Sequence, residues 1–426
     1  MARFRTPADP NMTSSERGMH RVAMLSMHGC PVARLGERDT GGMNVYLLRV
    51  ARELGERGHL VDVYTRVHDA RDAHLMDLGR NARVVHLEAG PYQETKASLQ
   101  QYIPEFLESL KEFQESEGIT YDQIHSHYWL SGLAGIELSR ALGIPHTTTF
   151  HTLARAKMEA RPAEAEPANR LAAETLVARS VDSIVVSTEQ EKSDLGRLYD
   201  VAVERVDVVP AGVDLDLFQP IDQATARQEL GLTESKVILS VGRVEPLKGV
   251  DILISAVSEL DDISDTRLLI VGGEPGSDPE LQKLMELAAT LGVADSVTFI
   301  GAVEQTELPK YYSAADVFVM PSYYESFGLA ALEAMACGTP IVSSSAAGGP
   351  NSFVEEGETG YLIPWPSPES YAERLEQLLG DTTTRERVGR AARAKALTMG
   401  WDTVASGLSR HYDRAAAGAW FNVAGG

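Results

Sequence analysis

Residues 317–338 read VFVMPSYYESFGLAALEAMACG, in which a β-branched and aromatic run is followed by a turn and an apolar helical pattern. VFVMPS predicts a strand, and GLAALEAMACG predicts the helix that follows it. The stretch also carries two carboxylates, Glu325 in the turn and Glu333 within the apolar helical run. Because a charged side chain is not expected at a buried helix position, Glu333 predicts a polar partner in the interior.

The same alternation of strand and helix patterns recurs along the chain, and it is typical of parallel sheets covered by helices on both faces. The predicted strands of the first half are RVAMLSMH, VDVYTR, RVVHLEAG, QIHSH, HTTTFHT, SIVVST and VDVVPAG, and those of the second half are VILSVGR, RLLIVGG, SVTFIG, VFVMPS, PIVSSS and YLIPW. A chain of 426 residues is long enough for two such domains. We therefore predict an α/β protein with two Rossmann-like, doubly wound domains.

The segment VVPAGVDLDLFQPIDQ separates the two groups of strands. It is rich in Pro, Gly and Asp and has no helical period, so it predicts the hinge between the domains. The first domain is then expected at 19–212 and the second at 213–401. Residues 1–18 lack the apolar segment of a secretory signal and predict a disordered extension.

Composition excludes several classes of function. The 39 basic and 61 acidic side chains give a net charge of −22, which argues against a nucleic-acid partner. Cys30 and Cys337 match no zinc or redox spacing, so we expect a reducing, cytoplasmic location and no metal site. No run of about 18 consecutive apolar residues occurs, so no membrane-spanning helix is expected.

Two doubly wound domains are expected to leave a cleft at the carboxyl ends of their strands, where ligands bind. No G-x-G-x-x-G motif opens a helix there, which disfavours a dinucleotide-dependent dehydrogenase. Gly41 and Gly42 precede a predicted helix at 43–59, and backbone amides at a helix N-terminus suit a phosphate. Arg243 and Lys248 follow a predicted strand and suit a diphosphate. An ordinary helix cap and solvated loop charges are the alternatives.

Histidines stand at the ends of three predicted strands: His28, the pair His125 and His127, and His151. A single histidine is more often a satisfied core or surface residue than a catalytic group. Their shared placement at strand ends nevertheless indicates the cleft. His151 is the strongest candidate, because FHT is followed by a polar segment instead of more core.

The turn at Glu325 should face the same cleft. The amides of 326–329 would form the first turn of the helix and would cap a diphosphate between Arg243 and Lys248. Glu325 would then accept hydrogen bonds from sugar hydroxyls, and Glu333 would reach the diol of a ribose, because a carboxylate accepts from two neighbouring hydroxyls.

These motifs resemble those of retaining nucleotide-sugar glycosyltransferases of family 4. ESFGLAALE is similar to their E-x7-E signature, and GRVEPLKG is similar to their GR-x4-KG donor-phosphate segment. The resemblance extends over about 20–416, and DTGGMNVYLL, EAGPY, HSHYWLSG, FHTL and GETGYL look most like the branch whose acceptor is inositol phosphate. It implies a GT-B fold with two domains facing a cleft. It also implies a C-terminal helix, WDTVASGLSRHYDRAAA, that crosses back so that 402–418 complete the first domain.

The resemblance also implies a role for each site residue. Catalytic roles are implied for His151 and Glu325, donor binding for Gly41, Gly42, Arg243, Lys248, Glu325, Ser326, Phe327, Gly328, Leu329 and Glu333, and acceptor binding for His28, Asn44, Lys96, Tyr128, Thr152 and Arg170. No metal ligand is implied and no cofactor is required, although a peripheral Mg²⁺ ion is compatible with the chemistry. The implied reaction retains configuration, with the leaving diphosphate helping to deprotonate the acceptor hydroxyl on the same face.

The resemblance favours a UDP-linked donor, such as UDP-N-acetylglucosamine or UDP-glucose, a small phosphorylated acceptor such as inositol phosphate, and a homodimer. Sucrose-phosphate synthases share the D-T-G-G, GR-x4-KG and E-x7-E elements but typically carry Gln where this chain has Met43 and Asn44. A sucrose-phosphate-synthase-like or GDP-mannose-dependent transferase is therefore the second choice. A sugar-nucleotide epimerase and a protein that only binds sugar nucleotides are the alternatives from other classes.

Overall fold

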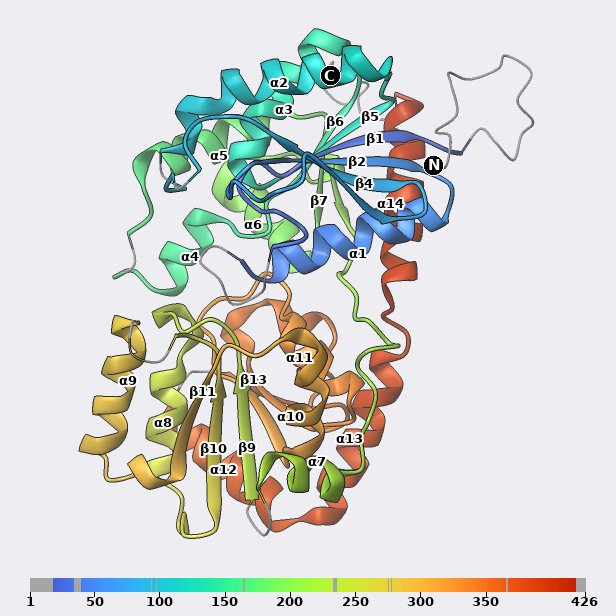
Figure 1. The fold of residues 1–426 in the computed structure, drawn as a ribbon. Coiled ribbons are helices and arrows are strands. Elements are labelled where there is room, and N and C mark those ends of the chain that lie inside the picture. The colour runs from blue at the N-terminus through green and yellow to red at the C-terminus, as the bar shows by residue number, and fades with distance from the viewer. Residues whose placement is uncertain are drawn as a thin grey trace.

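The computed structural model describes residues 18–33, 40–92, 94–96, 98–163, 165–232, 236–274, 276, 278–364 and 367–418. Within these residues the longer strand ladders form two sheets, one of eight strands and one of six, which lie in different halves of the molecule (Figure 1). The predicted α/β fold with two doubly wound domains is thereby confirmed. The predicted disordered extension lies outside the described residues, apart from Gly18.

The eight-stranded sheet of the first half has the order β3-β4-β2-β1-β5-β6-β7-β8. Its strands are β1 (Arg21–Leu25), β2 (Leu60–Arg66), β3 (Leu75–Gly79), β4 (Ala82–Leu87), β5 (Gln123–His127), β6 (His146–Thr149), β7 (Ser183–Val186) and β8 (Val206–Val208). Neighbouring strands pair in parallel, except that β3 and β4 are antiparallel. The sequence prediction missed β3, because this edge strand is largely exposed and lacks the apolar run of a buried strand.

The six-stranded sheet of the second half is parallel throughout and has the order β11-β10-β9-β12-β13-β14. Its strands are β9 (Lys236–Val241), β10 (Thr266–Val271), β11 (Val297–Gly301), β12 (Val317–Met320), β13 (Ile341–Ser344) and β14 (Tyr361–Ile363). The opening stretch thus forms β12 and the helix after it, as predicted. The predicted domain boundaries fall outside both sheets, and their positions stay a prediction.

Helices cover both sheets (Figure 1). Those of the first half are α1 (Gly42–Glu56), α2 (Ile103–Glu117), α3 (Tyr128–Leu142), α4 (Ala154–Ala160), α5 (Ala168–Ser180) and α6 (Glu189–Tyr199). Those of the second half are α7 (Gln223–Leu230), α8 (Val250–Ser258), α9 (Pro279–Thr290), α10 (Leu308–Ala314), α11 (Leu329–Ala336), α12 (Pro368–Gly380) and α13 (Thr382–Ala396). Among the described residues, no helix is long and apolar enough to cross a membrane.

The last described helix, α14 (Trp401–Ala416), packs against α1 of the first half, although the chain before it belongs to the second (Figure 1). This confirms the predicted crossing. The Tyr412 hydroxyl lies 2.7 Å from His125 Nδ1 in β5, and His411 Nδ1 lies 2.5 Å from Asp207 Oδ2 in β8. A buried and a partly buried hydrogen bond therefore fix the position of α14 on the first sheet.

Replacing Tyr412 with phenylalanine is expected to weaken the attachment of α14. The substitution keeps the ring but removes the hydroxyl, which leaves buried His125 Nδ1 without this partner. An unsatisfied buried polar group costs about 1–3 kcal/mol, so the free energy of unfolding in urea should fall by that amount. Arg410→Ala, at an exposed position of the same helix, is the control and should change it by less than about 0.5 kcal/mol. Equal stability of Tyr412→Phe and the unmodified protein would contradict this role.

Candidate active site

The candidate site lies where loops from the carboxyl ends of the two sheets meet. The strand order reverses between β1 and β5 in the first sheet and between β9 and β12 in the second. Ligands of open α/β sheets bind at such reversals, because the loops on either side diverge and leave a crevice. Most of the predicted site residues follow these four strands or the nearby strands β4 and β6.

The two glycines before α1 lie against the second half of the molecule. A Cβ atom on Gly41 would be 3.6 Å from Arg243 Nε. A Cβ atom on Gly42 would be 3.2 Å from Leu329 Cδ1. Asn44 shapes this turn, because its Oδ1 accepts a hydrogen bond from the Gly41 amide at 3.0 Å. The paired glycines therefore allow the start of α1 to approach the predicted donor residues closely.

The turn between β12 and α11 differs from the prediction. α11 begins at Leu329, after Gly328 in the left-handed region at φ 97°. Ser326 and Phe327 precede the helix, so the prediction that they belong to its first turn is wrong. The left-handed glycine redirects the chain here. The Ser326 hydroxyl donates to the His151 carbonyl of the other half, while the Phe327 side chain packs in the core.

Each of the two predicted donor cations has a carboxylate partner. Lys248 Nζ lies 2.6 Å from Glu325 Oε1. The same oxygen accepts a hydrogen bond from Ser322 Oγ at 2.8 Å. Arg243 lies 2.6 Å from Glu245 Oε1 and is half exposed. The structure therefore brings Lys248 and Glu325 together, whereas Arg243 stands beside the glycine loop; a diphosphate between the two cations stays a prediction.

Glu333 has the polar partner that the sequence predicted. Its carboxylate is buried and accepts hydrogen bonds from the Tyr312 hydroxyl at 2.8 Å and from Gln305 Nε2 at 3.4 Å. Burial raises the pKa of Glu333 to about 7, and the two hydrogen bonds only partly oppose this shift. Tyr312, whose hydroxyl donates to Glu333 from α10, was not identified from the sequence.

His151 and His127 form a pair at the ends of two neighbouring strands. His127 Nδ1 lies 2.9 Å from His151 Nε2, and the rings stack with centroids 5.2 Å apart. Burial lowers the pKa of His151 to about 3 and holds the pKa of His127 well below its usual range. Both rings are therefore neutral near pH 7, so the pair can donate and accept hydrogen bonds but offers no imidazolium.

Two residues at these strand ends adopt the left-handed region without being glycine. His151 has φ 62° and Tyr128 has φ 74°. Such conformations cost on the order of 1–3 kcal/mol and concentrate where function requires a particular side-chain direction. They single out the ends of β5 and β6 as a candidate binding surface, which agrees with the predicted placement of the acceptor residues.

The predicted acceptor residues converge around the Tyr128 ring. The Arg170 guanidinium lies 5.0 Å from the ring centroid and Lys96 Nζ lies 5.5 Å from it. Arg170 Nη2 donates to Thr152 Oγ1 at 3.0 Å, and the His28 ring lies 4.5 Å from the Tyr128 ring. The structure thus brings five of the six predicted acceptor residues into one cluster, which combines two cations with two hydroxyls.

Arg170 is already paired with two carboxylates that the sequence prediction missed. Its guanidinium lies 2.8 Å from Glu166 Oε2 and 2.7 Å from Glu174 Oε1, and Glu174 is completely buried. The spacing of four residues on either side of Arg170 is the signal that could have revealed both partners. Arg170 therefore contributes geometry to the cluster more than free positive charge.

A cavity of about 380 Å³ opens beside this cluster. It is lined by Met27, His28, Cys30, Ala33, Thr40, Asn44, Thr65, Arg66, His68, Tyr92, Glu94, Lys96 and Leu99. Its volume falls in the range of small-molecule sites, about 300–1,000 Å³. The Asn44 amide is already engaged by the backbone, because its Nδ2 donates to the Cys30 carbonyl at 2.8 Å and its Oδ1 accepts from the Gly41 amide. His28 and Lys96 are therefore the predicted acceptor residues best placed to contact a molecule in this cavity.

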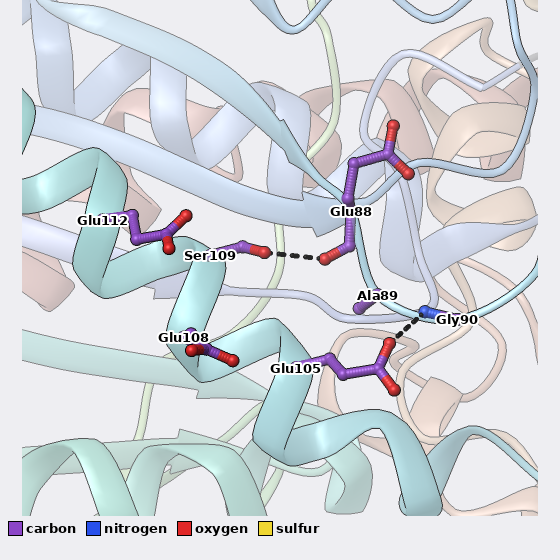
Figure 2. Close-up of a pocket in the computed structure, with 7 residues that line it drawn as sticks. All are labelled: Glu88, Ala89, Gly90, Glu105, Glu108, Ser109 and Glu112. Carbon is purple, nitrogen blue, oxygen red and sulfur yellow. Dashed lines mark hydrogen bonds between the residues drawn. The ribbon is translucent and has the colours of Figure 1, made fainter.

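A second hollow, of about 410 Å³, lies between the end of β4 and α2 (Figure 2). Its lining residues are Glu88, Ala89, Gly90, Glu105, Glu108, Ser109 and Glu112. Two side chains of the hollow already form hydrogen bonds with its backbone: Ser109 Oγ donates to the Glu88 carbonyl at 2.8 Å, and Glu105 accepts from the Gly90 amide at 2.9 Å. Four carboxylates would repel a phosphorylated ligand, so this hollow does not fit the predicted substrates.

The fold and this site define a class of protein. Residues 41–212 match the glycosyl transferase 4-like domain, and residues 222–395 match glycosyl transferases group 1. Each match covers one side of the crevice, and solved glycosyltransferases share the arrangement of the two sheets. The chain therefore belongs to the family 4, group 1 glycosyltransferases and has the GT-B fold.

The relatives of known sequence include D-inositol 3-phosphate glycosyltransferases. That of Corynebacterium glutamicum is 40% identical over 408 residues, or 93% of this chain and 97% of the relative. That of Mycobacteroides abscessus is 39% identical over 405 residues, or 93% of this chain and 90% of the relative. These relatives cover both halves of the crevice described above.

Among solved structures, the sucrose-phosphate synthase of Thermosynechococcus elongatus has a TM-score of 0.86 and 31% identity, and the match covers 94% of this chain and 100% of that one. A structure of Anabaena HepE with UDP and glucose has a TM-score of 0.73 and 20% identity, covering 92% of this chain and 99% of that one. HepE thus shares the fold with this chain.

The raised pKa of Glu333 predicts a pH dependence of stability. Between its usual pKa of 4.5 and about 7, folded Glu333 keeps a proton that the unfolded chain has lost, so the free energy of unfolding falls as pH rises. Glu333→Gln removes this titration while keeping an acceptor for Tyr312. Between about pH 4.5 and about pH 7.5, the free energy of unfolding of the variant should fall by up to about 3 kcal/mol less than that of the unmodified protein.

Urea unfolding at both pH values measures this difference. Glu56→Gln is the matched control, because it makes the same chemical change at an exposed position of α1. It should follow the unmodified protein across the pH range. The assignment fails if Glu333→Gln loses as much stability with rising pH as the unmodified protein does.

Proposed function

We propose that the protein is a retaining glycosyltransferase that moves a sugar from a UDP-linked donor to a hydroxyl of inositol phosphate. The cluster around Tyr128 is the observation that carries the acceptor assignment. Lys96 and Arg170 lie within 5.5 Å of the ring centroid, and Thr152 offers its hydroxyl beside them. The Lys96 ammonium and the hydroxyl donors match the oxygens of a phosphate monoester, and Arg170 holds the Thr152 hydroxyl beside them. Relatives that are 40% identical over most of the chain carry the name of that activity.

The donor assignment is supported by the residues on the other side of the crevice. Lys248 and Glu325 are held together at the carboxyl ends of β9 and β12, and Arg243 stands beside the glycine loop. In the proposed complex, Lys248 and Arg243 bind the diphosphate and Glu325 accepts hydrogen bonds from the transferred sugar. Lys248 then stabilises the negative charge that grows on the leaving diphosphate.

In the proposed reaction the glycosidic bond to the diphosphate breaks while the acceptor oxygen bonds to the same face of the sugar. The acceptor proton passes to the leaving diphosphate oxygen, so no side chain must change its charge. His151 is suited to a hydrogen-bonding role, because its low pKa keeps the ring neutral. The protein would then contribute orientation and electrostatic stabilisation.

The test is acceptor-dependent release of UDP. The protein is incubated with UDP-N-acetylglucosamine or UDP-glucose, with or without D-inositol 3-phosphate, and free UDP and product mass are measured. The proposal expects UDP release and a product of acceptor plus one sugar only when the acceptor is present, with the anomeric configuration of the donor retained by NMR. An epimerase would convert the donor without an acceptor, and a binding protein would leave it unchanged.

Sucrose-phosphate synthesis is the second candidate, because the sucrose-phosphate synthase of Thermosynechococcus elongatus is 31% identical over 94% of this chain. Fructose phosphate would then replace inositol phosphate as the acceptor. The same assay separates the two: turnover with fructose phosphate but not with inositol phosphate would overturn the first proposal and support the second.

Lys96→Met should weaken acceptor binding selectively. Lys96 lines the cavity, and a lost charged hydrogen bond of about 1.5–3 kcal/mol corresponds to a KM for the acceptor that is about 10- to 150-fold higher. The KM for the donor should stay within about twofold. Arg170 is less suitable for this test, because its removal would leave buried Glu174 without its charge partner.

Lys111→Met on α2 is the matched control, because its side chain is largely exposed to solvent. It should leave both KM values unchanged. Equal use of inositol and its phosphate, or an acceptor KM that Lys96→Met does not alter, would refute the phosphate-binding assignment.

A further inference from the structure

Three potential metal ligands converge at the ends of three neighbouring strands in the first half. Cys30 follows β1, His68 follows β2 and His86 lies in β4, and these strands are adjacent in the order β4-β2-β1. One sulfur or nitrogen atom from each side chain lies within 4.8 Å of the other two. The roles assigned above to the donor and acceptor residues use none of these three side chains.

The hydrogen bonds of His86 set which ring nitrogen faces the cluster. Its Nδ1 lies 2.7 Å from the Ala73 carbonyl, and a carbonyl can only accept, so Nδ1 carries the hydrogen. Nε2 is then the nitrogen with the lone pair, and it lies 3.3 Å from Cys30 Sγ. Both side chains are buried, with exposed fractions of 1% for His86 and 4% for Cys30.

A carboxylate also lies beside the His68 ring. His68 Nδ1 lies 2.9 Å from Asp72 Oδ2, which accepts hydrogen bonds from the amides of His68 at 2.9 Å and Asp69 at 3.0 Å. Metal-binding histidines characteristically donate their second ring nitrogen to a carboxylate or a backbone carbonyl. The Ala73 carbonyl is such a partner for His86, whereas Asp72 lies close to His68 Nδ1 without forming a hydrogen bond to it.

We propose that Cys30, His68 and His86 form a binding site for a borderline-soft divalent metal ion of the Zn²⁺ type. One thiolate and two imidazoles are ligands that such ions prefer over Mg²⁺. Tetrahedral zinc with bonds of about 2.3 Å to sulfur and about 2.0 Å to nitrogen places these two ligand atoms roughly 3.5 Å apart. The observed 3.3 Å between Cys30 Sγ and His86 Nε2 is close to that separation.

The fourth coordination position is expected to face the cavity of about 380 Å³, because Cys30 and His68 both line it. Three protein ligands and one open position are the pattern of zinc sites that accept water or another small ligand. Binding of the ion would replace the thiol proton of Cys30, which is released to solvent. The proposal does not depend on the identity of the sugar acceptor.

A hydrogen bond between the Cys30 thiol and His86 is the simpler explanation of the 3.3 Å contact. It does not explain why a ring nitrogen of His68 also lies within 4.8 Å of both atoms. The two explanations differ in a spectroscopic property, because only a metal bound by thiolate produces a sulfur-to-metal charge-transfer band.

Cobalt titration of the full-length protein tests the site. After treatment with a chelator, the protein is titrated with Co²⁺, which takes the place of Zn²⁺ and is visible by absorption. We expect one equivalent to bind, with a thiolate-to-cobalt charge-transfer band in the near ultraviolet that Zn²⁺ then abolishes by displacement. Cys30→Ser should lose this band. Cys337→Ala, which removes the other cysteine on the second half, should keep it.

Two further variants separate coordination from folding. Asp72→Asn, which removes the negative charge beside His68 but keeps an oxygen that can accept from the amides of His68 and Asp69, should weaken Co²⁺ binding about 10- to 100-fold, and His86→Gln should weaken it at least as much. Circular dichroism and gel filtration establish that each variant is folded. The proposal is overturned if the folded, unmodified protein shows no charge-transfer band, or if the band survives Cys30→Ser or disappears in Cys337→Ala.

Discussion

The crossing of α14 onto the first sheet is the interaction on which the arrangement of the two halves depends. Tyr412 and His411 bond to His125 and Asp207, which belong to strands of the first sheet, although α14 follows the second sheet in the chain. Each of these polar groups would cost free energy if buried without a partner, so the helix has one favourable position. Because α14 ties the second half to the first sheet, the loops after β1, β5, β9 and β12 face the same crevice.

Arg243, Lys248 and Arg170 in this crevice are each paired with a carboxylate, although the protein as a whole carries a net charge of −22. Lys248 is held by Glu325, and Arg170 is held by Glu166 and Glu174. In the proposed reaction, an incoming phosphate competes with a carboxylate that is already present. Such pairing keeps each paired cation in place before the substrate arrives. Binding then exchanges one anionic partner, the carboxylate, for another, the phosphate. At physiological salt, long-range repulsion by the acidic surface affects this exchange little.

Parallel strands explain why so many polar side chains meet here. Successive strands deliver their last residues to one edge of the sheet, so groups far apart in the chain become neighbours. The His127 and His151 pair and the proposed metal ligands arise in this way. Burial keeps the two paired rings neutral, and left-handed backbone at His151 directs its ring toward His127. The same geometry therefore supplies neutral hydrogen-bonding groups at one point of the edge and soft metal ligands at another.

The sequence by itself determined the fold class, because apolar strand segments that alternate with amphipathic helices bury their apolar surfaces as parallel sheets covered by helices. It also located Glu333 and predicted its buried partner, since a carboxylate in an apolar helix requires one. It missed the exposed strand β3 and the start of α11, where Gly328 turns the chain before the helix begins. Only the tertiary structure decided that Cys30 meets His68 and His86. Their spacing in the chain carries no such signal, because strand order in the sheet, set by packing of the whole domain, makes them neighbours.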